Sequence, residues 1–236
     1  AQVREGGMTM TNATIQERNV RLTTPRSAAL AGIIFALLFA ASLVFLRLAI
    51  PSDLTGEIGW ITQARNYLSI ALVLMPFAGI AFLWFIGVIR DRFGEFEDRF
   101  FSTVFFGSSL LFIGMVFVAM AVAGALVATV SVDGNYTIDP DVVLFGRALM
   151  LQISNVYALR MAGVLMFSLG TIWWHTRLMP RWLVGVTYLL ASVLLLVVNL
   201  SLWITLLFPA WVLLVSVYVL LQSHRGQTPV TPGDEE

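Results

Sequence analysis

Two residue types are missing from this chain, and each absence excludes a kind of chemistry. There is no cysteine among the 236 residues, and the 14 cationic side chains other than histidine are all arginine, because lysine is absent. Without lysine the chain cannot form a Schiff base with retinal or pyridoxal phosphate, which excludes a rhodopsin-type photoreceptor. Without cysteine it cannot form a disulfide, a thiolate nucleophile, a cysteine-ligated iron–sulfur cluster or a lipoprotein anchor.

Charge is also scarce, and apolar residues take its place. Charged residues make up 12% of the chain and hydrophobic residues 58%, with a mean hydropathy of +0.86. A soluble domain of this size could not bury so much apolar surface. Uncharged runs at 27–46, 66–89, 100–132 and 182–223 are each long enough to cross a hydrocarbon core of ~30 Å, and such crossings must be helical. We therefore expect an all-α, polytopic membrane helical bundle whose main partner is the lipid bilayer.

The distribution of arginine predicts six transmembrane helices with both ends in the cytoplasm. Ten arginines precede the first span or follow spans two, four and six, whereas Arg47, Arg65 and Arg147 fall on the opposite side. Arginine is concentrated on the cytoplasmic side of membrane proteins. Its exclusive use here is typical of a GC-rich bacterial genome, so we expect a multi-pass protein of the bacterial cytoplasmic (inner) membrane.

The ends of the chain are polar and are predicted to lie outside this domain. We expect a flexible cytoplasmic N-terminal tail at residues 1–26, a six-helix transmembrane domain at 27–223 and a disordered cytoplasmic C-terminal tail at 224–236. The residues before Met8 have no apolar core and no small-residue cleavage site, unlike a signal peptide. We expect translation to begin at Met8 or Met10.

A capping pattern predicts that the fourth helix is longer than the bilayer is thick. Asp139, Pro140 and Asp141 form an N-cap, a proline at the first helical position and a first-turn acid. The helix is expected to run from Pro140 to about His175. That is ~54 Å, against a hydrocarbon core of ~30 Å.

The third helix, predicted from Phe100 to about Val130, is too long by roughly 15 Å on the same estimate. Both excesses lie on the outer side, so these helices either tilt steeply or form a projecting hairpin around Gly134. A projecting hairpin would leave apolar side chains that need cover from each other or from a partner. The expected partner is another membrane protein or a second copy of this chain. The side chains concerned are Val142, Leu144, Phe145, Leu149 and Leu151.

The last apolar run, from Trp182 to Ser223, has 42 residues and is about twice as long as one crossing. It must fold back on itself, with an outer turn expected between Asn199 and Phe208. The tryptophans at span ends are expected to form an aromatic belt at the membrane surfaces. They include Trp84, Trp173, Trp174 and Trp182.

Arg160 lies inside the fourth span, where an arginine costs roughly 2.5–3.5 kcal/mol at the helix centre. In a structural interpretation it snorkels to the outer boundary or pairs with an outer acid such as Asp53 or Asp133. In a functional interpretation it contacts an anion or substrate in an outward-facing polar pocket. The neutral residues that could line such a pocket, or instead join helices, are Gln152, Asn155, Gln63 and Asn66.

We find no pattern typical of a catalytic, metal-binding or cofactor-binding site. His175 and His224 both fall at the cytoplasmic edge, and they form neither a transmembrane haem pair nor a zinc ligand set. The acids around Asp139 do not follow the spacing of a calcium loop. A net charge of zero gives no reason to expect nucleic-acid binding. We expect no enzyme activity and no cofactor.

Two segments in the last third of the chain carry a family resemblance. Phe167-Ser168-Leu169-Gly170 ends one span, and the turn Pro180-Arg181-Trp182-Leu183 precedes the last two spans. This order resembles a family of small, uncharacterised six-span bacterial integral membrane proteins, classed as a domain of unknown function. The resemblance implies a topology and no activity, so no functional residue is carried over from it.

Two functional hypotheses follow from these observations. The first is a non-enzymatic binding, sensing or assembly component of the membrane. The alternative is a small-solute permease with an outward-facing polar pocket around Arg160. Permeases usually show broken helices or several buried ionisable groups. The sequence predicts one proline inside a span and one buried arginine, which favours the first hypothesis.

Overall fold

The computed structural model describes residues 25–49, 60–93, 99–131, 139–196 and 202–225, and all elements in these ranges are helices. The all-α fold class is confirmed for this part of the chain. The predicted tails lie almost wholly outside these ranges, as do Asp53, Asp133 and the turn around Gly134. In chain order the elements are α2 (Pro25–Ala49), α3 (Trp60–Phe93), α4 (Arg99–Ser131), α5 (Pro140–Leu151), the π-helical segment η1 (Gln152–Ala158), α6 (Leu159–Thr176), α7 (Arg181–Leu196), the 3-10 segment η2 (Leu202–Leu206) and α8 (Leu207–Arg225).

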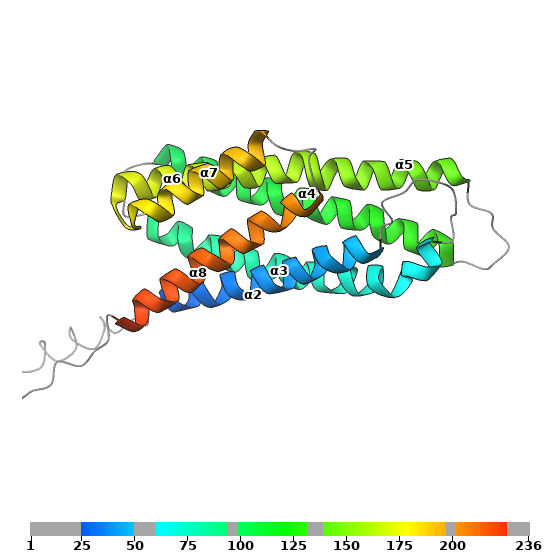
Figure 1. The fold of residues 1–236 in the computed structure, drawn as a ribbon, viewed down its shortest axis with the longest axis horizontal. Helices are drawn as coiled ribbons and strands as arrows, with labels where there is room; N and C mark the ends of the chain where they lie inside the picture. The colour runs from blue at the N-terminus through cyan, green and yellow to red at the C-terminus, as the bar shows by residue number, and fades with distance from the viewer. Residues whose placement is uncertain (1–24, 50–59, 94–98, 132–138, 197–201, 226–236) are drawn as a thin grey trace, which may run out of the picture.

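The helices form one elongated bundle, with the start of α2 and the end of α8 at the same end (Figure 1). The turn between α6 and α7, residues 177–180, lies at this end too, which we call the turn end. The opposite end, where α5 begins, is called the α5 end. Among the described residues, five helical stretches are long and apolar enough to cross a membrane, as expected of a multi-pass membrane protein.

The fourth span is one continuous helical rod, as predicted. It begins where the Asp139 carboxylate accepts a hydrogen bond from the backbone N–H of Asp141 at 3.0 Å, with Pro140 at the first helical position. The backbone stays right-handed helical through η1, and the rod ends at Thr176, one residue beyond the predicted end. Its apolar span of 36 residues is ~54 Å long. We call α5, η1 and α6 together the α5–α6 rod.

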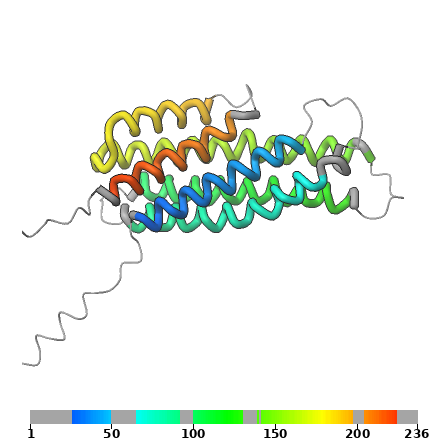
Figure 2. Tube along the Cα trace, turned by 60° about the horizontal axis from the view of Figure 1, so that its bottom comes forward, coloured from blue at the N-terminus to red at the C-terminus, as the bar shows by residue number. Residues whose placement is uncertain are grey.

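The third predicted helix is also overlong, since α4 has 33 residues and measures ~50 Å. The second was not expected to be so long, but α3 has 34 residues and includes Pro76. α7 is much shorter than α3, α4 and the α5–α6 rod, since its 16 residues measure ~24 Å. It runs from the turn end only part of the way along the bundle (Figures 1 and 2). The helices of the bundle therefore differ in length, and α7 is shorter than the helices beside it.

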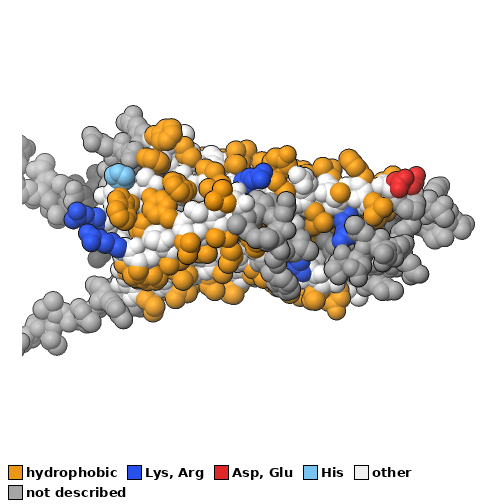
Figure 3. Space-filling view, turned by 45° about the horizontal axis from the view of Figure 1, so that its top comes forward, with side chains coloured by type: hydrophobic (Ala, Val, Ile, Leu, Met, Phe, Trp, Pro, Cys, Tyr) orange, Lys and Arg blue, Asp and Glu red, His pale blue; other side chains and the backbone are white. Residues whose placement is uncertain are grey.

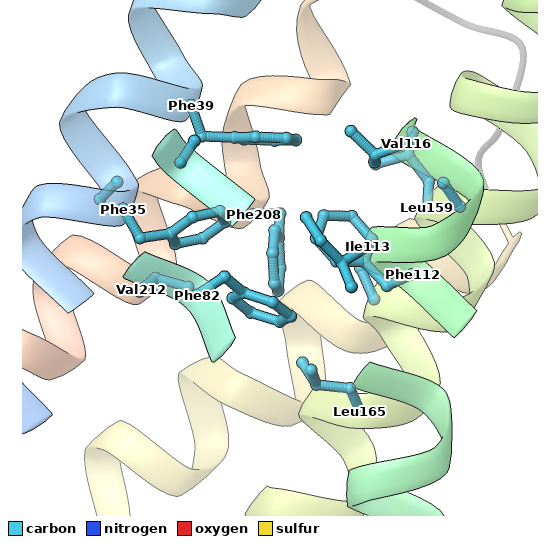
Figure 4. Packing of buried hydrophobic residues seen from close by; sticks show 14 of the residues in the cluster. Phe35, Phe39, Phe82, Phe112, Ile113, Val116, Leu159, Leu165, Phe208 and Val212 are labelled. Carbon is cyan, nitrogen blue, oxygen red and sulfur yellow. The ribbon is translucent and has the colours of Figure 1, made fainter. Parts of the chain in front are cut away.

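The helices pack as two groups that meet between α3 and α4. α2 lies against both α3 and α8, whereas α4 lies against the α5–α6 rod, and α7 packs on α6. A cluster of phenylalanine side chains joins four helices in the core (Figure 4). Phe112 of α4 lies 4.7 Å from Phe208 of α8 and 5.4 Å from Phe82 of α3, measured between ring centroids. Phe35 of α2 is 4.7 Å from Phe82. We call Phe35, Phe39, Phe82, Phe112 and Phe208 the phenylalanine cluster.

The predicted fold-back of the last apolar run is confirmed, because α7 and α8 leave and return to the same end (Figure 1). A buried hydrogen bond joins them, in which Trp211 Nε1 donates to Thr187 Oγ1 at 2.9 Å. The prediction of an aromatic belt was wrong for one tryptophan. Trp173 is buried, 6.2 Å from the Trp211 ring, while its neighbour Trp174 is exposed. Adjacent helical residues point about 100° apart, so one of such a pair faces the core when the other faces lipid.

Candidate functional site

The predicted site residues lie on different faces of the bundle. Arg160, in the first turn of α6, is exposed, and so are Gln152 in η1 and Asn66 on α3. Asn155 is half-buried, and the side chain of Gln63 lies outside the described part of the chain. η1 packs mainly against α4, α5 and α6, whereas α3 packs mainly against α2 and α4, so Asn66 and Asn155 belong to different helix contacts.

Arg160 has neither a hydrogen bond nor an ion pair within the part of the chain that the structure describes. A space-filling view shows arginine patches scattered over a hydrophobic surface, with an acidic patch at the α5 end (Figure 3). Pairing of Arg160 with Asp53 or Asp133 concerns residues outside the described ranges. The ligand contact at Arg160 thus stays a prediction, and a different arginine reaches the interior.

That arginine is Arg47, in the last turn of α2. It lines an interior cavity of about 30 Å³ together with three polar residues, Ser154, Asn155 and Thr205. The rest of the lining is apolar and comes mainly from α2, α3, α4 and the α5–α6 rod, including Phe39 and Phe112 of the phenylalanine cluster. A cavity of this volume holds about one water molecule when polar partners surround it. We call it the Arg47 cavity.

Both irregular segments of the bundle contribute to the Arg47 cavity. The π-helical segment η1 supplies Ser154 and Asn155, and the 3-10 segment η2 supplies the buried Thr205. Ser154 Oγ donates to the backbone carbonyl of Met150 at 2.9 Å and lies 3.4 Å from Asn155 Oδ1. π-Helical turns inside α-helices occur frequently at functional sites. The polar lining and the backbone irregularity therefore coincide at one place.

Sequence reasoning missed Arg47 because it assigned this residue to the outer end of a span by counting arginines. A usable signal was present: Phe35, Phe39 and Leu43 recur every four residues, and Arg47 is the next position of that series. Positions four apart share a helix face. The first three of these side chains are buried, and the fourth follows them into the interior.

The chemistry available in the Arg47 cavity is binding, with no acid–base pair. Its described lining contains neither a histidine nor a carboxylate. Arginine stays protonated and cannot act as a general base, although its guanidinium can donate up to five hydrogen bonds to an anion or to water. The two hydroxyls and the amide can complete the coordination of a bound water or a small anion.

Comparison with known proteins does not assign this chain to a family. No protein-family model matches it, and neither the curated proteins nor the solved structures give a significant match. The resemblance of the turn at Pro180 to uncharacterised six-span bacterial membrane proteins accordingly remains a prediction, and the function is argued below from this chain's own residues.

Proposed function

We propose that this chain is a non-enzymatic assembly component of the bacterial cytoplasmic membrane that associates with a second copy of itself through the outer part of the α5–α6 rod. It crosses the membrane six times, with both ends in the cytoplasm and α7 as the fifth crossing. The position of the start of α2 and the end of α8 at the same end of the bundle supports an even number of crossings.

The length of the rod carries this proposal. An apolar helix of 36 residues is ~54 Å long and, even at a tilt of ~40°, still spans ~41 Å. This exceeds the ~30 Å hydrocarbon core by ~11 Å, which corresponds to about ten residues of tilted helix. When Thr176 lies at the cytoplasmic boundary, most of α5 stands outside the hydrocarbon.

α5 nevertheless carries apolar side chains that the described part of the chain leaves exposed. Val143, Gly146 and Met150 are buried against the bundle, and Leu126 of α4 lies directly over Gly146. On the other face Phe145 is 68% exposed and Val142 is 57% exposed, with Leu144 and Leu149 also exposed. Such a patch outside the hydrocarbon needs a protein to cover it.

A second copy is the occupant that the geometry favours. Val142, Phe145 and Leu149 follow the i, i+3, i+7 spacing by which two parallel helices pack along a seam. Two copies inserted in one membrane share an orientation, so their α5 helices run parallel. A two-fold axis along the membrane normal then brings the same face of each copy together.

The absence of native cysteine makes this proposal directly testable. Phe145→Cys places one thiol at the centre of the seam, and mild oxidation of membranes should link two copies through it. Leu189→Cys is the matched control, because Leu189 is 65% exposed on α7, far from the seam in sequence and on another helix.

The expected result is a covalent dimer with Phe145→Cys and a monomer with Leu189→Cys. Equal cross-linking of both variants would show collision in the membrane rather than a specific seam. A Phe145→Cys protein that stays monomeric would overturn self-association and leave a different membrane protein as the partner to be sought.

The alternative hypothesis, a small-solute permease, gains support from the Arg47 cavity rather than from Arg160. Interrupted helices at a binding site are typical of transporters, and residues of both η1 and η2 line the same cavity as the half-buried Arg47. Chloride efflux from proteoliposomes tests this hypothesis. Efflux that is lost in Arg47→Gln and kept in Arg160→Gln would favour the permease, whereas no efflux above protein-free liposomes would exclude chloride transport.

A further inference from the structure

A second and larger cavity lies at the turn end of the bundle, between α8 and the α6–α7 turn. Its volume is about 320 Å³, near the lower limit of the ~300–1,000 Å³ typical of ligand pockets. Its walls come from four helices and the turn and are mainly apolar. They include Ala28 of α2, Phe85 of α3, Trp173 of α6, Met179 of the turn, and Val215 and Val219 of α8. We call it the turn cavity.

The turn cavity adjoins a pocket that carries two arginines. This neighbouring pocket, of about 270 Å³, shares Trp173 and Met179 with the turn cavity and is lined by Arg177 and Arg181. Both guanidinium groups belong to exposed side chains. Polar side chains also stand at the rim, where Arg26 Nε donates to Ser223 Oγ at 3.1 Å. The apolar turn cavity thus lies beside a pocket lined by two arginines.

The backbone at Arg177 has an unusual conformation. Arg177 ends α6 with φ 53° and ψ 24°, in the left-handed region, and it is the one non-glycine residue with a positive φ among those described. Glycine, or sometimes asparagine, is the usual residue at such a helix end because it has the least steric cost there. An arginine held in this conformation suggests that its side chain is needed at the turn.

The electrostatic field at this turn favours an anion. Arg181 is the first residue of α7, and helix N-termini attract negative charge through their exposed N–H groups. At the turn end, Asp91 is the one carboxylate whose side chain the structure describes, and Arg90 lies beside it in the chain. Arg90 itself stacks on the ring of Phe106, 4.1 Å from its centroid.

We propose that the turn end binds an anionic phospholipid, with its phosphate on Arg177 and Arg181 and part of one acyl chain in the turn cavity. The two halves of the site match the two halves of such a lipid, since basic pockets between membrane helices bind acidic headgroups. Exposed Trp174 and Trp182 flank the turn, at the level where indole rings meet lipid headgroups. A soluble anion could bind to the arginines but would leave the turn cavity empty.

Native mass spectrometry of the full chain in mild detergent can measure this preference. The protein is offered phosphatidylglycerol and phosphatidylcholine with identical acyl chains, and the bound fraction of each lipid is compared. We expect phosphatidylglycerol to bind roughly 30-fold more tightly when both arginines contribute, and each arginine to supply about fivefold of that preference.

The arginine variants separate binding from folding. Arg177→Gly removes the cation and relieves the left-handed strain, so the lipid preference should fall about fivefold while Tm stays level or rises. Arg177→Gly with Arg181→Gln should abolish the preference. Arg160→Gln is the matched control, because Arg160 is also exposed but lines neither of these two pockets. A preference that survives the double substitution, or falls as far in Arg160→Gln, would overturn the proposal.

Filling the cavity tests the acyl-chain half of the site. Val219→Phe narrows the turn cavity and should weaken binding of both lipids, whereas Val217→Phe, on an exposed face of the same helix, should not. Glycerol phosphate is the soluble counterpart of the headgroup. If it displaces phosphatidylglycerol at equal concentration, or if Val219→Phe binds lipid as well as the wild type, the site holds a free anion and the lipid proposal fails.

Discussion

The two cavities of this bundle differ in size and in where their arginines lie. In the Arg47 cavity the half-buried Arg47 belongs to the lining itself, which is otherwise mostly apolar apart from Ser154, Asn155 and Thr205, and the free volume is about 30 Å³. In the turn cavity the interior is apolar and ten times larger, at about 320 Å³, and the arginines stand in the adjoining pocket. The phenylalanine cluster contributes Phe39 and Phe112 to the first cavity, and Phe82 of that cluster lies 6.4 Å from Phe85 in the second.

The difference shows what each cavity can hold. The small Arg47 cavity has room for about one water molecule beside the guanidinium. The larger turn cavity has room for part of a hydrocarbon chain. Phe39 and Phe112 of the phenylalanine cluster line the Arg47 cavity, so changes to the packing of this cluster should affect the two cavities differently.

The largest expected effect is that of Phe112→Ala. Phe112 is buried against Phe39, Phe82 and Phe208, so truncation leaves a void and should lower the free energy of unfolding by about 3 kcal/mol. The void joins the Arg47 cavity and makes it resemble the turn cavity. Thermal unfolding in detergent measures the loss, and Phe100→Ala, an exposed position on the same helix, should leave Tm nearly unchanged.

Gly32→Ala should disturb the turn cavity instead. A Cβ at Gly32 would lie 2.0 Å from Ser216 Oγ and 2.8 Å from Phe85 Cδ2, so these two side chains, which line the turn cavity, or the helices that carry them would have to move. We expect a loss of about 2 kcal/mol. Gly87→Ala is the control, since a Cβ there meets nothing within 4 Å. A Gly32→Ala protein as stable as Gly87→Ala would contradict the close helix contact.

Trp211→Phe tests the link between the two helix groups behind the turn cavity. It removes the hydrogen bond to Thr187 Oγ1, which keeps its own bond to the Leu183 carbonyl, so the cost should be about 1 kcal/mol. Thr187→Val should cost a similar amount, and the double variant should cost less than the two single losses combined. Additive losses would mean that the two side chains act independently.

The smallest expected effect is an increase in stability, in Ser216→Ala. Ser216 is buried between α2 and α8, and its hydroxyl has no hydrogen-bond partner in the described part of the chain. Ser216→Ala removes an unsatisfied polar group and should raise stability by about 0.5 kcal/mol. A decrease in Tm would indicate that the hydroxyl is bonded in the membrane, for instance to water or to a ligand in the turn cavity.

The parts of the fold that local sequence determines were predictable. Asp139 and Pro140 mark the start of the α5–α6 rod because capping depends on a few adjacent residues. The mainly apolar sequence that follows indicates the length of the rod. The length of α7 was not predictable, since the run from Trp182 to Ser223 contains no proline or charge before Pro209 to mark where the helix ends.

The candidate site was harder to predict, because its residues come from distant segments. Arg47, Asn155 and Thr205 meet only when α2, η1 and η2 are placed side by side, and no local pattern brings them together. Asn155 was singled out as a membrane amide, but it was grouped with Arg160, which the helix places on another face. An arginine that lines an interior cavity from the end of a helix, as Arg47 does, looks in sequence like an arginine at the membrane boundary.

The short α7 also changes how the bilayer meets this protein. Leu196, at the far end of α7, is 82% exposed, and α7, at ~24 Å, is shorter than the ~30 Å hydrocarbon core by ~6 Å. Gly163, one turn beyond Arg160, packs beside Leu195 near that same end. Arg160 stands ~24 Å from Thr176 along the rod, which is about the length of α7. If α7 is the fifth crossing, as proposed, the leaflet beside it would thin to match its length, and the headgroups would then lie near Arg160.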